Sequence, residues 1–233
     1  MRFVLTHIPR TGGTSLFAAL QTLLPEAKSA EFKSLAQVAV MSDRELNSYD
    51  IISTYIGSKF FDRLEGSWTK IVVLRDPIPR LKSSYWNLRN NSNHISFATP
   101  LAKSLGFREY LALRENVVIL QATNVQAWTI FGDRSIFFRE KHAYLSENKI
   151  CEIALNRLAT YDFIGFTEHL DELWRHMCQK FRWPATQLPI LRKSLSMPEF
   201  EEASPIDLAF HTALDSEFIR RTRVLYNASV GNG

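Results

Sequence analysis

The stretch RFVLTHIPRTGGTS, residues 2–15, indicates how this chain folds. Residues 2–8 are mostly apolar or β-branched, which is typical of a short buried strand. A turn with two glycines follows, and apolar periodicity predicts a helix from about Ser15 to Leu24 that stops at Pro25. A strand that turns directly into a helix is a typical opening of an α/β fold.

The same alternation of strands and helices continues along the chain. A capping-box pattern over residues 42–45 predicts a short helix to about Tyr49. Runs of apolar and β-branched residues predict further strands over 50–56, 70–74 and 162–166. Strands separated by helices predict an α/β fold with a mainly parallel central sheet. Further helices are predicted over 78–90, 107–115, 117–131, 146–160, 168–181 and about the last 25 residues, with an irregular segment over 184–205.

Composition limits the class of protein. The chain has 233 residues, 45% of them hydrophobic and 22% charged, with only 9 Gly and 9 Pro. These values exclude a disordered, collagen-like or coiled-coil chain, and the length predicts a single domain over 1–233. The net charge of +4 is too small to indicate a nucleic-acid partner, but it suits a compact anionic ligand held by a few arginines.

Cysteine spacing and hydropathy point to an intracellular protein. Cys151 and Cys178 form no CxxC pattern, so we expect two buried free thiols and no metal site. No run approaches the roughly 18 apolar residues of a membrane span. The first residues run into a predicted strand without a signal-peptide core. We therefore expect a cytoplasmic protein without a membrane span.

A first motif between the first strand and the first helix is suited to binding an oxyanion. Its glycines permit a sharp turn with inward N–H groups, and the helix start adds the positive end of its dipole. The alternative is a plain strand-to-helix turn. The Walker pattern is not met, because the spacing is shorter and no lysine precedes Thr14. The motif consists of Pro9, Arg10, Thr11, Gly12, Gly13, Thr14 and Ser15.

A second motif follows the strand at 70–74. Arg75 comes at the carboxyl end of this strand, where open α/β sheets bind ligands. Ser83 lies eight residues later on the next predicted helix, where its hydroxyl can face the same side. An arginine fork and a hydroxyl suit a second phosphate group. The alternative is a surface pairing of Arg75 with Asp76.

The two motifs together resemble those of a known family. HIPRTGGTSL (7–16) and VVLRDPIPRLKSSY (72–85) resemble the sulfotransferases that use 3′-phosphoadenosine 5′-phosphosulfate (PAPS). The likeness is greatest to the carbohydrate, heparan-type branch, which reads HIPKTGGTSL and LRDPxxRxxSxY. A weaker likeness extends over residues 124–126 and 161–168.

The resemblance implies a three-layer P-loop-like fold and a set of binding roles. By this resemblance, residues 10–15 bind the 5′-phosphosulfate, and Arg75 and Ser83 bind the 3′-phosphate. PAPS would be the co-substrate, and no metal would be needed. The acceptor would be a hydroxyl of a carbohydrate or another small molecule.

The resemblance also bears on catalysis. Arg10 stands where the family has lysine; it can stabilise charge on the leaving oxygen but cannot donate a proton. We expect His94, in the loop after the second motif, to be the general base, the alternative being a solvent-exposed histidine. His7 is expected to pack or hydrogen-bond at the strand end. Where many relatives have Gly-His, this chain has Gly57-Ser58, and a serine hydroxyl is no base at neutral pH.

Two other functions stay open. A P-loop kinase is disfavoured, because the chain has no Walker lysine and no convincing strand-end carboxylate for magnesium. A non-catalytic nucleotide-binding protein with a decayed sulfotransferase site is favoured by Arg10 and Ser58. The sequence identifies neither the acceptor nor the oligomeric state.

Overall fold

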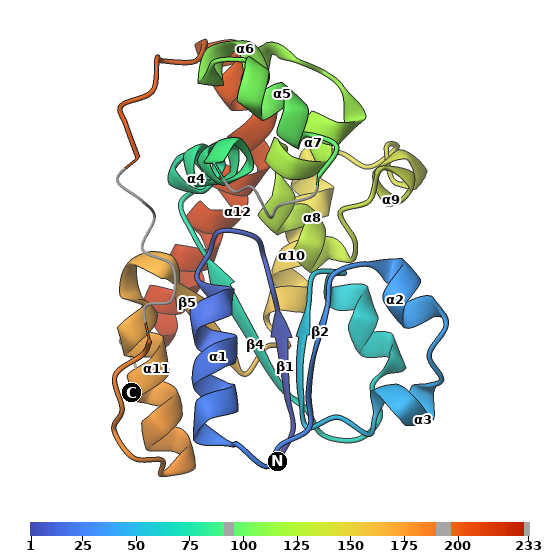
Figure 1. Cartoon of the computed structure of the whole chain (residues 1–233), viewed down its shortest axis with the longest axis vertical. Coiled ribbons are helices and arrows are strands. Elements are labelled where there is room, and N and C mark those ends of the chain that lie inside the picture. Colours follow the sequence, from blue (N-terminus) through green and yellow to red (C-terminus); the bar gives the residue numbers. More distant parts are fainter. Residues whose placement is uncertain (91–95, 190–196, 231–233) are drawn as a thin grey trace. The chain divides into compact units, whose positions relative to one another are not determined.

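The structure of the protein is a computed structural model (Figure 1). It contains a parallel β-sheet. The structure describes residues 1–90, 96–189 and 197–230, with side chains described up to 226. All strand pairings within these ranges are parallel, in the order β2-β3-β1-β4-β5. The predicted α/β class is therefore confirmed. The strands are β1 (Phe3–Thr6), β2 (Ser29–Phe32), β3 (Ile51–Thr54), β4 (Thr69–Leu74) and β5 (Phe163–Phe166).

The chain divides into two compact units. The first consists of Met1–Arg75, Thr129–Asp133 and Asn156–Lys193, and it contains every described strand. The second consists of Asp76–Trp128, Arg134–Leu155 and Ser194–Gly233. The expectation of one domain over 1–233 stays a prediction.

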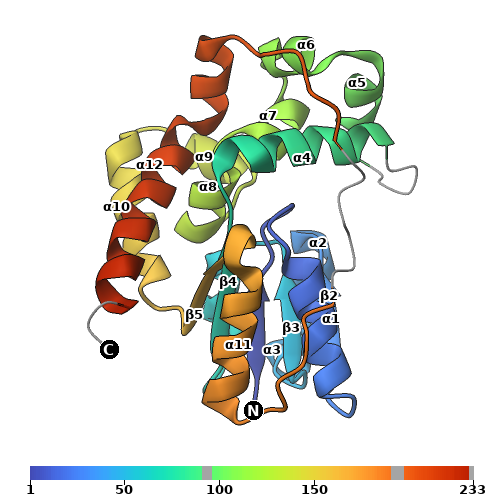
Figure 2. The same ribbon diagram turned by 90° about the vertical axis from the view of Figure 1, so that its left-hand side faces the viewer.

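Alternate residues of the strands face two different cores in the first unit. Phe3 and Leu5 face helices α1 (Gly13–Leu23) and α11 (Leu170–Phe181), which lie side by side on one face of the sheet (Figure 2). Val4 faces the opposite core. Burial of each large apolar side chain contributes roughly 1.5–3 kcal/mol, which is why these strands read as continuous apolar runs. The opposite core is formed with α2 (Leu35–Ala39), α3 (Asp43–Leu46) and the 3-10 helix η1 (Ser58–Arg63).

Helices form the described part of the second unit. Its core contains Leu81 and Tyr85 of α4 together with apolar side chains of α5, α6, α7 and the start of α12. The N-cap Ser135 of α9 accepts a hydrogen bond from Phe138 N, which fixes the start of that helix. Helices α8 and α10 each continue into the first unit. The helices are α4 (Pro77–Asn90), α5 (Thr99–Ser104), α6 (Phe107–Ala112), α7 (Asn116–Ala122), α8 (Val125–Phe131), α9 (Ile136–Lys141), α10 (Glu147–Leu158) and α12 (Pro205–Val230).

A broken helix and an added strand are among the differences from the sequence-based expectations. The single helix predicted over 117–131 is broken into α7 and α8, because Asn124 adopts a left-handed φ of 46° and its N–H donates to His211 O instead of continuing the helix. Strand β2 was not predicted. It lies at the edge of the sheet, and only Phe32 of its four residues is buried.

The two cysteines behave as expected. Both Cys151 and Cys178 are free and buried. Cys178 belongs to the first unit and Cys151 to the second. No helix within the described residues is long and apolar enough to cross a membrane.

Candidate oxyanion and nucleotide site

The turn between β1 and α1 has the backbone geometry of an anion-binding loop. Arg10 and Gly12 both adopt left-handed conformations, with φ of 71° and 96°. Glycine is required at position 12 because other residues rarely adopt this φ, and an added Cβ would also lie 2.8 Å from Leu170 Cδ2. The chain thus turns sharply within a few residues at the carboxyl end of β1.

The first turn of α1 begins without a side-chain cap from its N-cap residue, Gly12. Ser15 and Leu16 donate their N–H groups to Gly12 O at 3.1 and 3.3 Å, which closes the first turn. No side chain of the described residues caps this helix. The N–H groups of Gly13 and Thr14 precede these bonds and have no partner within the helix, so they can bind an anion at the positive end of the dipole.

Arg75 joins the second motif to this loop. It directly follows the last residue of β4, and its Nη1 donates to Arg10 O at 3.1 Å. The first motif and the arginine of the second, 65 positions apart in sequence, are therefore in contact within the first unit. Arg10, Arg75 and the start of α1 therefore belong to the same edge of the sheet.

Thr167 fixes the loop from a third strand, and sequence reasoning missed it. It follows β5, and its Oγ1 lies 2.7 Å from Thr11 O and 3.1 Å from Leu74 O, so one hydroxyl bridges the loop and the end of β4. Thr11 is fully buried and donates its own hydroxyl to Ile8 O at 2.9 Å. The weak family likeness over 161–168 was the only sequence signal for Thr167.

Tyr161 supports the end of β1. Its hydroxyl lies 2.8 Å from Thr6 Oγ1, and burial raises its pKa well above the usual value for tyrosine. The phenol is therefore neutral at physiological pH. It satisfies a buried polar group of the strand that leads into the loop.

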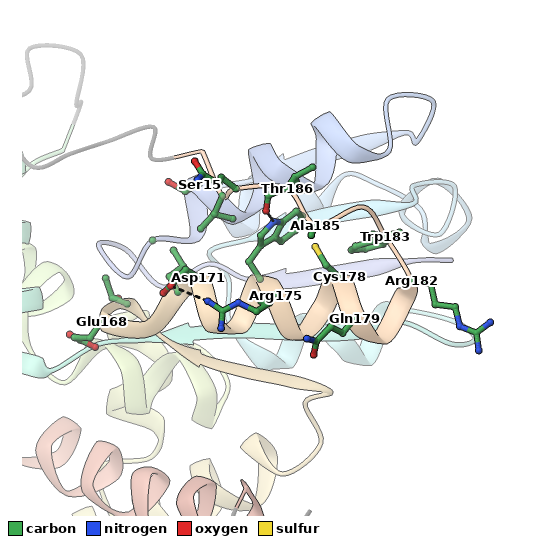
Figure 3. A pocket seen from close by; sticks show the side chains of 16 residues that line it. Ser15, Glu168, Asp171, Arg175, Cys178, Gln179, Arg182, Trp183, Ala185 and Thr186 are labelled. Carbon is green, nitrogen blue, oxygen red and sulfur yellow. Dashed lines mark hydrogen bonds and ion pairs between the residues drawn. The ribbon is translucent and has the colours of Figure 1, made fainter.

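A pocket of about 1090 Å³ adjoins the loop (Figure 3). Gly12 and Ser15 form the part next to α1, and Thr167 lines it from the end of β5. The far wall includes Trp174, whose Nε1 donates to Thr186 O at 2.9 Å and so holds the extended segment that follows α11. Asp171 and Arg175 of α11 form an ion pair at 3.5 Å in the wall of the pocket. Further polar and charged lining side chains, from α11 and the residues on either side of it, are Glu168, Gln179, Arg182 and Gln187.

The remaining predicted residues are Ser83, His94 and His7. Ser83 is buried on α4 and belongs to the second unit, so its pairing with Arg75 stays a prediction. His94 lies outside the described residues. His7 hydrogen-bonds and packs at the end of β1, as expected.

Ser58 has a structural role. Its hydroxyl donates to Ile130 O at 2.6 Å, and Arg157 donates to Ser58 Oγ and to Phe131 O. The preceding Gly57 has a φ of 106°, and an added Cβ would lie 2.4 Å from a backbone oxygen. The Gly57-Ser58 pair therefore allows this segment to pack closely against the backbone of residues 129–132 and to hydrogen-bond to it.

The turn that contains Arg10, the start of α1 and Arg75 all lie at the carboxyl edge of a parallel sheet, which is where open α/β sheets bind ligands. The model of the sulfotransferase family matches residues 1–228. The chain belongs to the sulfotransferase family, so sulfuryl transfer is its class of reaction. No curated protein matches the chain. The resemblance found in the two motifs is confirmed at the level of the family, and the carbohydrate branch stays a prediction.

Proposed function

We propose that this protein transfers a sulfuryl group from PAPS to a hydroxyl of a carbohydrate or another small molecule. The observation that carries the proposal is the hydrogen bond from Arg75 Nη1 to Arg10 O, because it links the two motifs that the family uses for the two ends of the nucleotide. The family match supports the reaction class. The nature of the donor and of the acceptor belongs to the proposal.

Each motif receives a role in donor binding. Residues 9–15 bind the 5′-phosphosulfate through backbone N–H groups, hydroxyls and the Arg10 guanidinium. Arg75 and Ser83 bind the 3′-phosphate. The pocket lined by Gly12, Ser15 and residues of α11 offers space for the nucleoside.

The reaction is an in-line displacement at sulfur. The acceptor oxygen attacks the sulfur, the bond from sulfur to the bridging phosphate oxygen breaks, and the nucleotide leaves with the electron pair. Arg10 stabilises the charge that develops on the leaving oxygen, in a position where a fixed cation needs no reorganisation. His94 accepts the proton of the acceptor hydroxyl. No step needs a metal.

A calorimetric titration with the product nucleotide, 3′-phosphoadenosine 5′-phosphate (PAP), tests donor binding. We expect the wild type to bind PAP, and Arg75→Ala to weaken binding at least tenfold because charge-assisted bonds to phosphate contribute roughly 1.5–3 kcal/mol each. Arg44→Ala is the matched control, since Arg44 is an exposed arginine of α3. Absence of PAP binding by the wild type would refute the proposal.

A second function follows from two residues. Arg10 in place of the family's lysine, and Ser58 with its hydroxyl bound to Ile130 O, favour a nucleotide-binding protein without turnover. Both functions predict PAP binding. Sulfuryl transfer from PAPS to a panel of glycans and small alcohols separates them, because only the enzyme releases PAP in the presence of an acceptor.

A further inference from the structure

A cluster of polar side chains lies under the anion-binding loop. His7 follows β1, and its backbone N–H donates to Thr54 O at 2.8 Å. Its Nδ1 lies 3.1 Å from Ser53 Oγ and its Nε2 lies 3.1 Å from Tyr55 Oη. The His7 and Tyr55 rings are stacked, with centroids 4.1 Å apart and an interplanar angle of 22°. The imidazole is thereby fixed in position although only 3% of His7 is exposed.

A carboxylate accompanies this imidazole. Glu31 of β2 has its Oε1 3.6 Å from His7 Nδ1, and Tyr55 donates its hydroxyl to the same oxygen at 3.4 Å. Lys33 pairs with the other oxygen at 3.1 Å. A protonated His7 would lie beside a negative charge and over the face of an aromatic ring, both of which stabilise a cation, while burial of the ring acts against the charged form.

The imidazole also touches the loop. A Cβ on Gly13 would lie 2.8 Å from His7 Cδ2 and 3.0 Å from Nε2, so the ring lies directly against the first residue of α1. Gly13 is one of the two residues whose N–H groups precede the first hydrogen bond of α1. Any change in the position or charge of His7 therefore acts at the point where the anion binds.

We propose that His7 is a positioning residue for the donor's phosphosulfate: its ring supports Gly13 from below, and its protonation, favoured by Glu31 and Tyr55, adds positive charge beneath the bound anion. This inference rests on the proposed function. Within the part of the chain that the structure describes, the groups that face His7 include Glu31 from β2 with Lys33 beyond it, Ser53 and Tyr55 from β3 and its continuation, and Gly13 from α1.

The test is a calorimetric titration of PAP into the full chain at pH 8 and at pH 6, for the wild type and for His7→Gln. Glutamine keeps a polar side chain but cannot become charged. The phosphates of PAP also take up protons near pH 6. The measured quantity is therefore the ratio of wild-type to variant affinity at each pH, in which the titration of the ligand cancels.

We expect this ratio to exceed one at pH 8, where His7 acts through the position of the loop, and to rise about threefold to tenfold at pH 6. A ratio that is the same at both pH values would overturn the inference, since a merely structural role does not depend on the charge of the imidazole. If the wild type itself does not bind PAP, the proposed function and this inference fail together.

A second variant keeps the inference testable if His7→Gln does not fold. Glu31→Gln is nearly isosteric and lies at a partly exposed edge strand. Because it removes the charge that favours protonated His7, the tightening of PAP binding relative to pH 8 should begin at a lower pH than in the wild type. An unchanged pH profile of affinity would contradict the inference. Thermal unfolding at pH 8 confirms that both variants are folded.

Discussion

At the scale of single residues, Arg10 combines an unfavourable backbone with a useful side chain. Its φ of 71° costs a residue with a Cβ roughly 1–2 kcal/mol relative to a right-handed conformation. Glycine would adopt the same φ without this cost, as Gly12 does two positions later. Backbone strain of this kind persists where the surrounding structure holds the residue in place, here in part through the hydrogen bond that Arg10 O accepts from Arg75.

We therefore expect stability and donor binding to separate at this position. Arg10→Gly should leave the free energy of unfolding within about 1 kcal/mol of the wild type, because relief of strain offsets the greater entropy of the unfolded chain. The same variant should lose at least tenfold in affinity for PAP. Arg10→Lys is the charge-retaining control. Urea denaturation and calorimetry measure the two effects, and a parallel loss of both in Arg10→Gly would contradict the prediction.

At the scale of elements, the junction between β5 and α11 fixes the loop through one hydroxyl. Thr167 lies in the short 3-10 helix η2 (Thr167–His169), where its Oγ1 reaches both Thr11 O and Leu74 O. These carbonyls belong to the loop and to the strand that ends before Arg75. The hydroxyl therefore ties together three segments that all end at the same edge of the sheet.

Removal of this hydroxyl should loosen the loop without disturbing the core. Thr167→Val keeps the shape of the side chain, and we expect PAP affinity to fall threefold to thirtyfold while thermal unfolding shifts by only a few degrees. Thr167→Ser should retain binding. Thr22→Val is the matched control, since Thr22 bonds only within α1, to Ala18 O. Equal affinities for Thr167→Val and the wild type in calorimetry would exclude this role.

The sequence predicts an element well when burial on both faces requires an unbroken run of apolar residues. β4 was predicted because Ile71, Val72 and Val73 are buried in a strand with neighbours on both sides. β2 was missed because an edge strand needs few apolar residues. From the sequence, Arg75 and Arg10 could be placed only at the same edge of the sheet, and their hydrogen bond could not be predicted. For Thr167, the weak family likeness over 161–168 marked the segment but not the contacts of its hydroxyl.

At the scale of the whole molecule, a buried histidine makes the stability of the second unit depend on pH. His211 Nε2 lies 2.9 Å from Leu111 O, a carbonyl that can only accept, so Nε2 carries the proton and Nδ1 accepts from the Thr123 hydroxyl at 2.7 Å. Burial lowers the pKa of His211 below its usual value of 6.5. The folded protein therefore holds this side chain neutral.

The sign of the pH dependence follows from this lowered pKa. Below pH 6.5 the unfolded chain binds a proton that folded His211 does not, so stability should be constant above this pH and fall as the pH drops below it. Urea denaturation between pH 8 and pH 5.5 measures the slope. His211→Gln should be less stable at pH 8 but show a flatter profile. The same slope in both proteins would show that other groups cause it.

The two buried thiols give the chain a pair of built-in chemical reporters. Cys178 belongs to the unit with the sheet, where it lines the pocket beside α11, and Cys151 belongs to the helical unit. Burial raises the pKa of Cys151, so a thiol reagent modifies Cys151 at the rate at which the helical unit opens, whereas Cys178 reports on the access to its pocket as well. Variants that retain a single cysteine allow the two rates to be followed separately, without an added label. Their comparison shows whether the sheet and the helices open as one cooperative structure or in succession.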